Sequence, residues 1–221
     1  VQHGSPRILK AMRRPGGAAG SVGFFAALRA DRPDLVLRST ALVGFPGEEE
    51  EDVALLADFL AAVRFDHLGT YRYSPEAGTP AAELPDPVPE EVSLDREALI
   101  MDLQAEISQQ RQETRLGRAW TTVVDRVVAA DDPEVADLLA GLDEGVWVDP
   151  AERETLAGVR RTGGTVALGR SEPYGDDLDG RVALPGAGLA PGQGLETEFR
   201  AVSPHDTWAR PLTASGRKGE P

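Results

Sequence analysis

The hydrophobic pattern in the first half of the chain alternates between helical and strand-like periods. Apolar residues recur at helical spacing in Ser5–Arg14, and a second helix is expected from about Ala18 to Ala30. Residues 35–43 then form an almost continuous apolar run, broken only by Arg38, Ser39 and Thr40. Such a run is typical of a strand that is buried on both faces of a parallel sheet.

The next elements complete a strand–helix–strand order. Apolar residues at intervals of three and four predict an amphipathic helix, and they are Val53, Leu56, Leu60 and Val63. Residues 67–73 predict the following strand, which implies a right-handed crossover in an α/β sheet. A proline-rich linker over residues 80–89 leads to a long helix from about Glu90 to Arg115. Its buried face is expected to carry Leu99, Leu103 and Ile107.

The second half of the chain has the texture of an all-β domain. Short β-type runs separated by Gly, Pro and Asp predict a small antiparallel barrel, and they cover residues 120–128, 164–169, 181–184, 195–202 and 207–210. Residues 131–158 fit no strand template and contain a predicted helix over 133–140. The fold class is therefore α/β plus all-β. We expect domains over 1–116 and 117–212 and a disordered tail over 213–221.

Charge and cysteine content narrow the function. Lys+Arg 23 against Asp+Glu 37 gives a net charge of −14, which disfavours nucleic-acid binding and favours a basic partner. The absence of cysteine excludes disulfides, thiolate zinc sites and cysteine-held iron–sulfur clusters within this chain. No apolar stretch reaches the about 18 residues of a membrane span, and no secretory signal is visible, so we expect a cytoplasmic location. The opening VQHGSPRILK reads as the continuation of something longer.

Gly44-Phe45-Pro46-Gly47-Glu48 is the most specific local motif. It lies where the apolar strand turns into a helix, and its glycines allow a ligand to approach the backbone closely. A tight turn that binds nothing is an equally good interpretation from the residues alone. Glu48 is the one acid here that we consider functional. The acids at 49–52 are attributed to the helix macrodipole.

Polar residues at neighbouring strands suggest a common site. Arg38 interrupts the apolar strand, so it needs either an internal ion-pair partner or a ligand. Tyr73 and Ser74 end the next strand, and polar groups at successive strand ends are expected to converge on one cavity. The three histidines form no metal-binding pattern, and no nucleophile–base pair is visible. Catalytic residues are therefore unknown, and we expect a cofactor, anchored mainly outside this chain, to perform the chemistry.

Four stretches, taken in order, resemble one family. They are Gln2-His3-Gly4-Ser5 with 7–14, then 37–48, then 65–69 with Tyr73-Ser74-Pro75-Glu76-Ala77-Gly78-Thr79-Pro80, and finally Gly169-Arg170-Ser171 with Asp179-Gly180. Together they resemble the C-terminal portion of the radical S-adenosylmethionine methylthiotransferases. The resemblance is nearly continuous to about Arg126 and patchier beyond, and residues 131–158 have no clear counterpart.

The resemblance implies a fold and a set of cofactors. The fold is the C-terminal part of a partial (β/α) TIM-like barrel followed by a small antiparallel TRAM β-barrel, which is OB-like. S-adenosylmethionine would contact Gln2, His3, Arg38, Gly44, Phe45, Pro46, Gly47, Glu48, Tyr73 and Ser74. In the family, a reduced iron–sulfur cluster cleaves S-adenosylmethionine to a radical, sulfur comes from an auxiliary cluster, and a second S-adenosylmethionine supplies the methyl group. Because the cluster cysteines are missing, this chain alone is expected to be inactive.

The resemblance also implies a substrate. tRNA-modifying relatives carry Ser after the Gln and Thr-Asp before the apolar strand, whereas this chain has His3 and Leu37-Arg38-Ser39, as in enzymes that modify an aspartate β-carbon of small ribosomal subunit protein twelve. Residues 117–221 have a net charge of −7. That charge suits a basic ribosomal protein, docked through Glu172, Asp176, Asp177 and Asp179. Alternatives are a tRNA methylthiotransferase and a non-catalytic module whose degenerate α/β part only supports the TRAM barrel.

Overall fold

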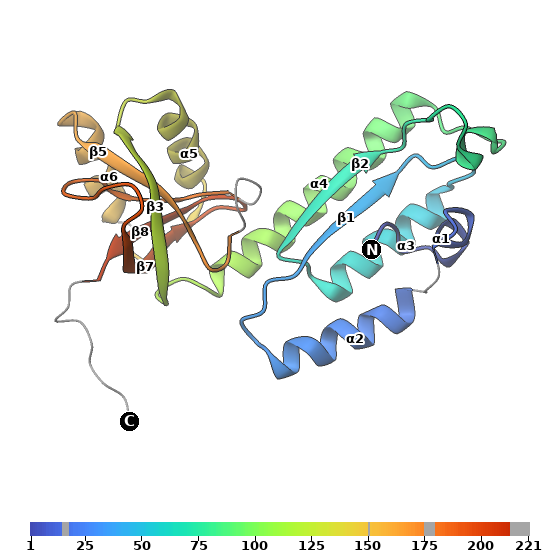
Figure 1. The fold of residues 1–221 in the computed structure, drawn as a ribbon, viewed down its shortest axis with the longest axis horizontal. Coiled ribbons are helices and arrows are strands. Elements are labelled where there is room, and N and C mark those ends of the chain that lie inside the picture. The colour runs from blue at the N-terminus through green and yellow to red at the C-terminus, as the bar shows by residue number, and fades with distance from the viewer. Residues whose placement is uncertain (15–17, 150, 175–179, 213–221) are drawn as a thin grey trace. The chain divides into compact units, whose positions relative to one another are not determined.

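The computed structural model describes residues 1–14, 18–149, 151–174 and 180–212. The chain forms two compact units, Val1–Ser108 and Gln109–Pro221 (Figure 1). The elements of the first unit are α1 (Pro6–Ala11), α2 (Ala18–Asp31), β1 (Arg38–Val43), α3 (Glu50–Val63), β2 (His67–Arg72), the 3-10 helix η1 (Pro80–Glu83) and α4 (Glu90–Glu113), whose last turn belongs to the second unit.

A parallel strand pair forms the centre of the first unit. β1 and β2 run in register from Arg38↔His67 to Val43↔Arg72, and α3 connects them, as the strand–helix–strand pattern predicts. The opening segment lies along the other edge of β1, where the Leu42 amide donates to the Gln2 carbonyl over 2.8 Å. The sheet differs from expectation in that only one face of β1 is buried. Side chains alternate across a strand, and the described helices pack on a single face.

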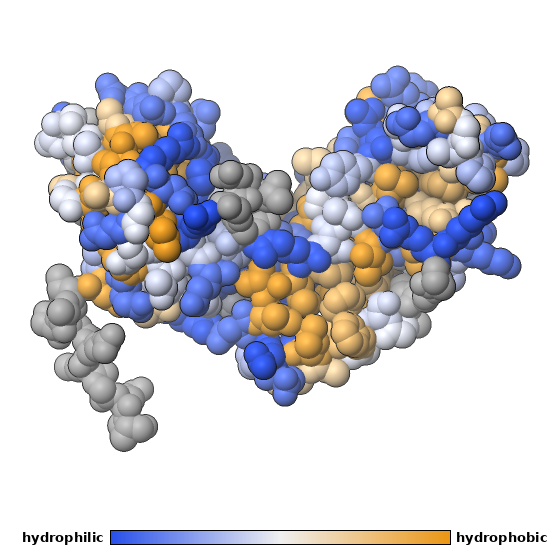
Figure 2. Space-filling view, in the orientation of Figure 1, coloured by the Kyte–Doolittle hydropathy of each residue, from blue (hydrophilic) through white to orange (hydrophobic). Residues whose placement is uncertain are grey.

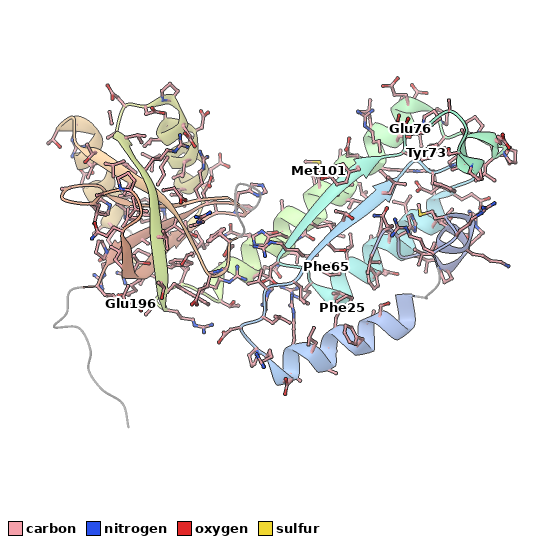
Figure 3. All side chains as sticks on the ribbon, in the orientation of Figure 1. Phe25, Phe65, Tyr73, Glu76, Met101 and Glu196 are labelled. Carbon is pink, nitrogen blue, oxygen red and sulfur yellow. The ribbon has the colours of Figure 1, made fainter. Side chains whose placement is uncertain are left out.

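The hydrophobic core of this unit lies between the strands and the helices. Phe65 is fully buried and meets Phe25 of α2 edge-to-face, with ring centroids 5.2 Å apart (Figure 3). On α4, Ile100 and Ile107 are buried, whereas Leu99 is 52% exposed, so the predicted buried face of this helix was wrong at Leu99. The helix is rotated because its polar residues also face inward: Gln104 donates to the Phe65 carbonyl over 2.9 Å.

A capping box fixes the start of α3. The Asp52 carboxylate accepts from the Glu49 amide over 2.9 Å and from the Ser5 hydroxyl over 2.6 Å, and it pairs with Arg7. Asp52 is only 4% exposed. It therefore does more than complement the helix macrodipole, because it also fastens the start of α1 to the start of α3.

Five strands of the second unit close into a barrel. They are β3 (Ala119–Ala129), β5 (Thr165–Ser171), β6 (Val182–Pro185), β7 (Gly194–Val202) and β8 (Thr207–Pro211). They follow the order β3-β5-β6-β8-β7, and a β3–β7 pairing completes the ring. Its strands lie close to the predicted runs, and the architecture is compatible with a TRAM-like barrel. One expectation is corrected, because β6 and β8 pair in parallel whereas the other pairs in the ring are antiparallel.

Residues 131–161 build a cover for one side of this barrel. They form α5 (Pro133–Asp143), a short strand β4 (Val146–Trp147) that pairs with β7, and α6 (Glu152–Arg161). The helix predicted over 133–140 is confirmed, whereas β4 and α6 have no counterpart in the sequence-based expectation. α5 buries Leu138, Leu139 and Leu142 against Trp208 and neighbouring strand residues. The segment is therefore part of the barrel core and not a surface loop.

A buried polar contact ties the end of α4 to the barrel. The Gln112 amide donates to the Tyr174 hydroxyl over 2.7 Å, and that hydroxyl also bonds Thr207. Burial raises the pKa of the Tyr174 phenol above its ordinary value, so the group stays neutral. In the part of the chain that the structure describes, no helix is both long and apolar enough to cross a membrane.

The contacts of Asp52 with Ser5, the Glu49 amide and Arg7 predict that the free energy of unfolding depends on pH. Burial raises the pKa of Asp52, but hydrogen bonds from Ser5, the Glu49 amide and Arg7 lower it by more than burial raises it. The net pKa therefore lies below the ordinary value. A depressed carboxyl pKa contributes stability that is present above the unfolded-state pKa of about 3.9 and is lost as pH falls through the folded value. Asp52→Asn is therefore expected to lower the free energy of unfolding by about 0.5–2 kcal/mol at pH 7.

Urea denaturation at pH 7, 5 and 3 measures this difference, which is expected to shrink only at the lowest pH. Glu50→Gln, an exposed position in the same helical turn, serves as the matched control and is expected to change stability little. A wild-type advantage over Asp52→Asn that stays constant down to pH 3 contradicts the assignment.

Candidate functional site

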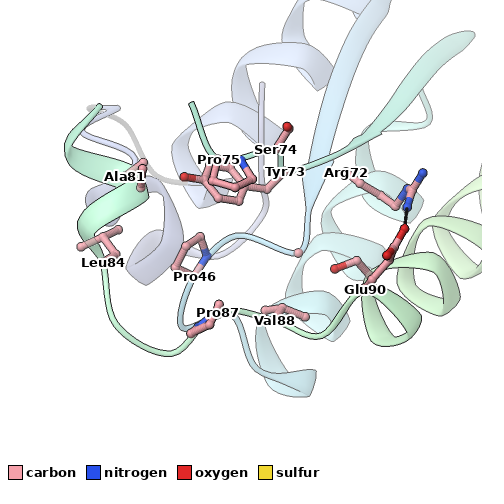
Figure 4. A pocket seen from close by; sticks show the side chains of 13 residues that line it. Pro46, Arg72, Tyr73, Ser74, Pro75, Ala81, Leu84, Pro87, Val88 and Glu90 are labelled. Carbon is pink, nitrogen blue, oxygen red and sulfur yellow. Dashed lines mark ion pairs between the residues drawn. The ribbon is translucent and has the colours of Figure 1, made fainter. Parts of the chain in front are cut away.

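A cavity lies at the carboxyl ends of β1 and β2 (Figure 4). Its volume is about 460 Å³, within the roughly 300–1,000 Å³ of small-molecule sites. Apolar side chains supply most of its wall, and they are Pro46, Pro75, Ala81, Ala82, Leu84, Pro87 and Val88. Polar groups come from Tyr73, Ser74, Ser93 and the ion pair between Arg72 and Glu90, which are 3.6 Å apart. The carboxyl ends of parallel strands are where α/β sheets place their ligands.

The turn after β1 adopts a conformation that glycine accommodates. Gly44 and Gly47 have φ of +75° and +76°, in the left-handed region that other residues rarely adopt. Their surroundings differ. A Cβ at Gly44 would lie 2.4 Å from the Ser93 hydroxyl, whereas a Cβ at Gly47 would meet open space. Of these two positions, only Gly44 is so close to a neighbouring element that a Cβ would not fit, and that element is α4.

The Glu48 carboxylate holds this turn from inside the protein. Its Oε1 accepts from the Gly44 amide over 3.0 Å and from Arg96 over 2.9 Å. Its Oε2 lies 3.4 Å from Nε2 of His3, and both side chains are fully buried. Nδ1 of His3 accepts from the Ser5 amide over 2.9 Å, so in the neutral ring Nε2 carries the hydrogen that faces Glu48. Glu48 is therefore a positioning residue, because its oxygens face protein groups instead of the cavity.

Tyr73 presents a polar atom that the protein leaves without a partner. Its ring packs edge-to-face against Phe45, with centroids 5.2 Å apart. Its hydroxyl is buried and finds no hydrogen-bond partner among the described residues. Buried hydroxyls are normally satisfied, and an exception at the wall of a cavity points to a group supplied by a ligand or by water. Ser74 follows and is exposed.

The structure brings together part of the predicted cofactor set. Gly44, Pro46, Tyr73 and Ser74 line the cavity, as expected from the ends of two neighbouring strands. His3, Phe45 and Glu48 are buried behind the turn, and Gly47 donates its amide to the Asp86 carbonyl over 2.7 Å.

Two other residues of the predicted set lie away from the cavity wall. Gln2 lies beside β1, with its side-chain amide 3.2 Å from the Thr40 hydroxyl. Arg38 is exposed at the opposite end of β1, so the expectation of a buried charge on this strand was wrong. In the second unit, Glu172 is exposed in the turn after β5. Asp176, Asp177 and Asp179 lie outside the described residues.

Sequence reasoning missed the contribution of α4. Ser93 fills the space over Gly44, Arg96 neutralises Glu48, and Glu90 pairs with Arg72 at the cavity wall. These positions recur at intervals of three, which places them on one face of the helix. Nothing in their composition distinguishes them from other solvated helix residues. In the described ranges no cluster of three His, Cys, Asp or Glu forms that is suited to hold a metal ion.

The two glycines allow a matched test of the turn. Gly44→Ala and Gly47→Ala impose the same backbone strain, but only Gly44→Ala also collides with Ser93. We expect Gly44→Ala to lower the free energy of unfolding by about 1–3 kcal/mol more than Gly47→Ala does. Urea denaturation measures both losses. In a double-mutant cycle, Ser93→Gly is expected to remove most of the excess, and equal losses in the two single variants would show that Ser93 does not constrain the turn.

Comparisons with known proteins agree with the motif resemblance. No protein-family model matches the chain. "Ribosomal protein uS12 methylthiotransferase RimO" of Alkalilimnicola ehrlichii is 38% identical over 213 residues, which cover 96% of this chain and 40% of that protein. The protein of the same name from Azoarcus sp. is 39% identical over 209 residues, covering 94% and 39%. That of Thermus thermophilus is 46% identical over 127 residues, covering 58% and 29%.

The chain thus spans about 40% of the length of the first two relatives. The aligned part includes nearly all of this sequence, so the similarity extends through both the strand pair with its cavity and the barrel. The chain is therefore similar over nearly its whole length to a portion of the RimO methylthiotransferases.

Proposed function

We propose that this chain is the cofactor- and substrate-binding portion of an enzyme that methylthiolates the aspartate β-carbon of ribosomal protein uS12. The observation that carries the proposal is the similarity to RimO proteins over 96% of the chain, together with the cavity at the strand ends. Those relatives act by name on ribosomal protein uS12, which favours a protein substrate over tRNA. In the complete enzyme, the first unit would be the last part of a partial (β/α) barrel. The enzyme would work in the cytoplasm, where ribosomes are assembled.

The cavity suits S-adenosylmethionine in size and lining. Its apolar proline and leucine walls fit the faces of a nucleoside, and the orphaned Tyr73 hydroxyl supplies a polar contact. Gly44 presents backbone at the cavity, and Ser74 and Ser93 add hydroxyls. When bound together with a reduced iron–sulfur cluster, S-adenosylmethionine supplies radical and methyl-transfer chemistry. The residues of this chain do not fit the cluster itself, because the sequence has no cysteine.

The protein groups of the site would bind and orient the cofactor. The Glu48 carboxylate, held by the Gly44 amide, Arg96 and His3, keeps the turn in one position at the end of β1. Phe45 holds the Tyr73 ring at a fixed angle. The apolar walls exclude water from a ligand that lies between them. The second unit, compatible with a TRAM barrel, would dock the basic ribosomal protein through its acidic segment, residues 172–179.

Cofactor binding is tested with a matched pair of tyrosines. Tyr73→Phe removes only the orphaned hydroxyl. Loss of one hydrogen bond worth about 0.5–1.5 kcal/mol is expected to raise the dissociation constant for S-adenosylmethionine roughly 2- to 12-fold. Tyr71→Phe, at a side chain 59% exposed on the preceding strand, is the control and is expected to bind normally. Isothermal titration calorimetry measures the affinities. Unchanged affinity in Tyr73→Phe at unchanged thermal stability would remove this hydroxyl from the cofactor site.

Substrate docking is tested by association kinetics. Changing Asp176, Asp177 and Asp179 to Asn removes three negative charges. It is expected to slow association with purified uS12, most strongly at low salt, because exposed charges are screened over about 8 Å at physiological ionic strength. Cofactor affinity is expected to stay unchanged. Stopped-flow association across a salt series makes the measurement. Equal rates for wild type and variant, or tighter binding to tRNA than to uS12 at physiological salt, contradict the proposed substrate.

A further inference from the structure

Charge is distributed unevenly along this acidic chain. Residues 1–30 contain no Asp or Glu and five Lys or Arg, whereas residues 31–221 contain all 37 acids and 18 bases. A strongly acidic protein that keeps one segment free of acids presents a local field of opposite sign. The basic residues of this segment are Arg7, Lys10, Arg13, Arg14 and Arg29.

Among these five basic residues, two form ion pairs with acidic side chains and three do not among the described residues. Arg7 pairs with Asp52, and Arg29 pairs with Asp66 over 2.9 Å. Lys10, Arg13 and Arg14 are exposed and have no acidic partner among the described residues. We call these three residues the α1 cation patch. Each has a solvated charge available for an external anion.

The end of α1 places the three cations together. Arg13 takes a left-handed conformation with φ of +56°, and its amide donates to the Lys10 carbonyl over 3.0 Å. The Arg14 amide donates to the Leu9 carbonyl over 2.9 Å. These bonds close the C-terminal end of the helix, so the patch emerges from one turn of chain.

The patch belongs to the end of the sheet that carries the cavity. α1 is fastened by Ser5 to Asp52, in the first turn of α3. That helix follows directly on the turn that holds Gly44, and His3, just before α1, faces Glu48 of the same turn. Figure 1 shows α1 near the carboxyl ends of β1 and β2, and Figure 2 shows strongly hydrophilic side chains over it.

Helix stabilisation does not account for three cations. One basic residue in the last turn complements the macrodipole by about 0.3–1 kcal/mol. Further cations at the same end repel one another and gain little from the dipole. Nor does solubility require them, because a net charge of −14 already keeps copies of the chain apart.

We propose that the α1 cation patch contacts the phosphate backbone of RNA beside the end of the first unit that carries the cavity. Two of its three side chains are arginines, whose planar guanidinium groups bind phosphate oxygens in pairs. The choice of RNA over another polyanion rests on the proposed function, since a ribosomal protein in its subunit is surrounded by rRNA. The overall negative charge does not prevent such a contact, because salt limits each field to about 8 Å.

The test uses the full chain and a fluorescent RNA stem–loop in a salt series. Three phosphate contacts predict that the logarithm of the binding constant falls with the logarithm of salt concentration with a slope of about −2 to −3. Binding is then expected to weaken roughly 16- to 64-fold between 50 and 200 mM salt. The triple variant Lys10→Gln, Arg13→Gln, Arg14→Gln is expected to lose nearly all of this slope.

A matched variant controls for net charge. Arg126→Gln, Arg161→Gln and Arg170→Gln also remove three cations, of which Arg170 is half-buried and the other two are exposed, but each of these has an acidic partner in the second unit. This variant is expected to bind RNA as the wild type does. Circular dichroism and thermal unfolding verify that both variants are folded.

Three results would overturn the inference. They are no RNA binding at 50 mM salt, equal binding by both triple variants, or tighter binding of the wild type to phosphatidylserine vesicles or to polyglutamate than to RNA. The assay needs neither methylthiolation nor uS12. If the chain binds S-adenosylmethionine and uS12 but not RNA, only the inference about the α1 cation patch is refuted. If it binds RNA but neither S-adenosylmethionine nor uS12, only the proposed function is refuted.

Discussion

One buried carboxylate organises the first unit. The Glu48 side chain is fully buried, and a carboxyl group in such a place is tolerated only if polar partners surround it. Its partners come from three parts of the chain: the Gly44 amide of the turn and Arg96 of α4 donate to Oε1, and Nε2 of His3 in the opening segment lies 3.4 Å from Oε2. Removal of one partner would leave a buried polar group unsatisfied, so these segments are tied to one geometry. The cavity wall at Gly44 and Pro46 is a consequence of that arrangement.

The same end of the unit carries a second polar fastening, of a different kind. Asp52 joins α1 to α3 through Ser5 and Arg7, and its own side chain is buried whereas that of Arg7 is exposed. Glu48 sets the turn from within, while Asp52 secures the helix that brings the cation patch to the surface. Both acids come from one run of carboxylates, which illustrates that burial and neighbours, and not residue type, separate a positioning group from a helix-capping group.

In the second unit the constraint is closure of the barrel. A strand that leaves a sheet exposes unpaired backbone groups, and β4 supplies a partner to β7 beyond the stretch that β3 covers. α5 then covers the core with leucines, and Arg200 of β7 holds Glu152 of α6 over 2.8 Å. The segment at 131–161 is therefore integrated by hydrogen bonds, apolar packing and an ion pair together.

Local pattern was sufficient to predict most elements of this protein. Hydrophobic spacing identified the strand–helix–strand unit, the long helix and five barrel strands, because periodicity reports which residues face a core. The motif at 44–48 located the turn of the candidate site, because a strand that ends in Gly-x-Pro-Gly has few conformations available. Composition excluded a cluster held by this chain, since the ligands are simply missing.

Only the tertiary structure decided what depends on contacts between distant residues. The rotation of α4, which exposes Leu99 and buries Gln104, depends on the Phe65 carbonyl, which lies between α3 and β2 and accepts a hydrogen bond from Gln104. The parallel β6–β8 pairing, the partners of Glu48, the orphaned Tyr73 hydroxyl and the free cations of α1 likewise involve residues tens of positions apart. Sequence determines which groups exist and their local periodicity; which of them become neighbours, and so which charges are neutralised, is set by packing of the whole chain.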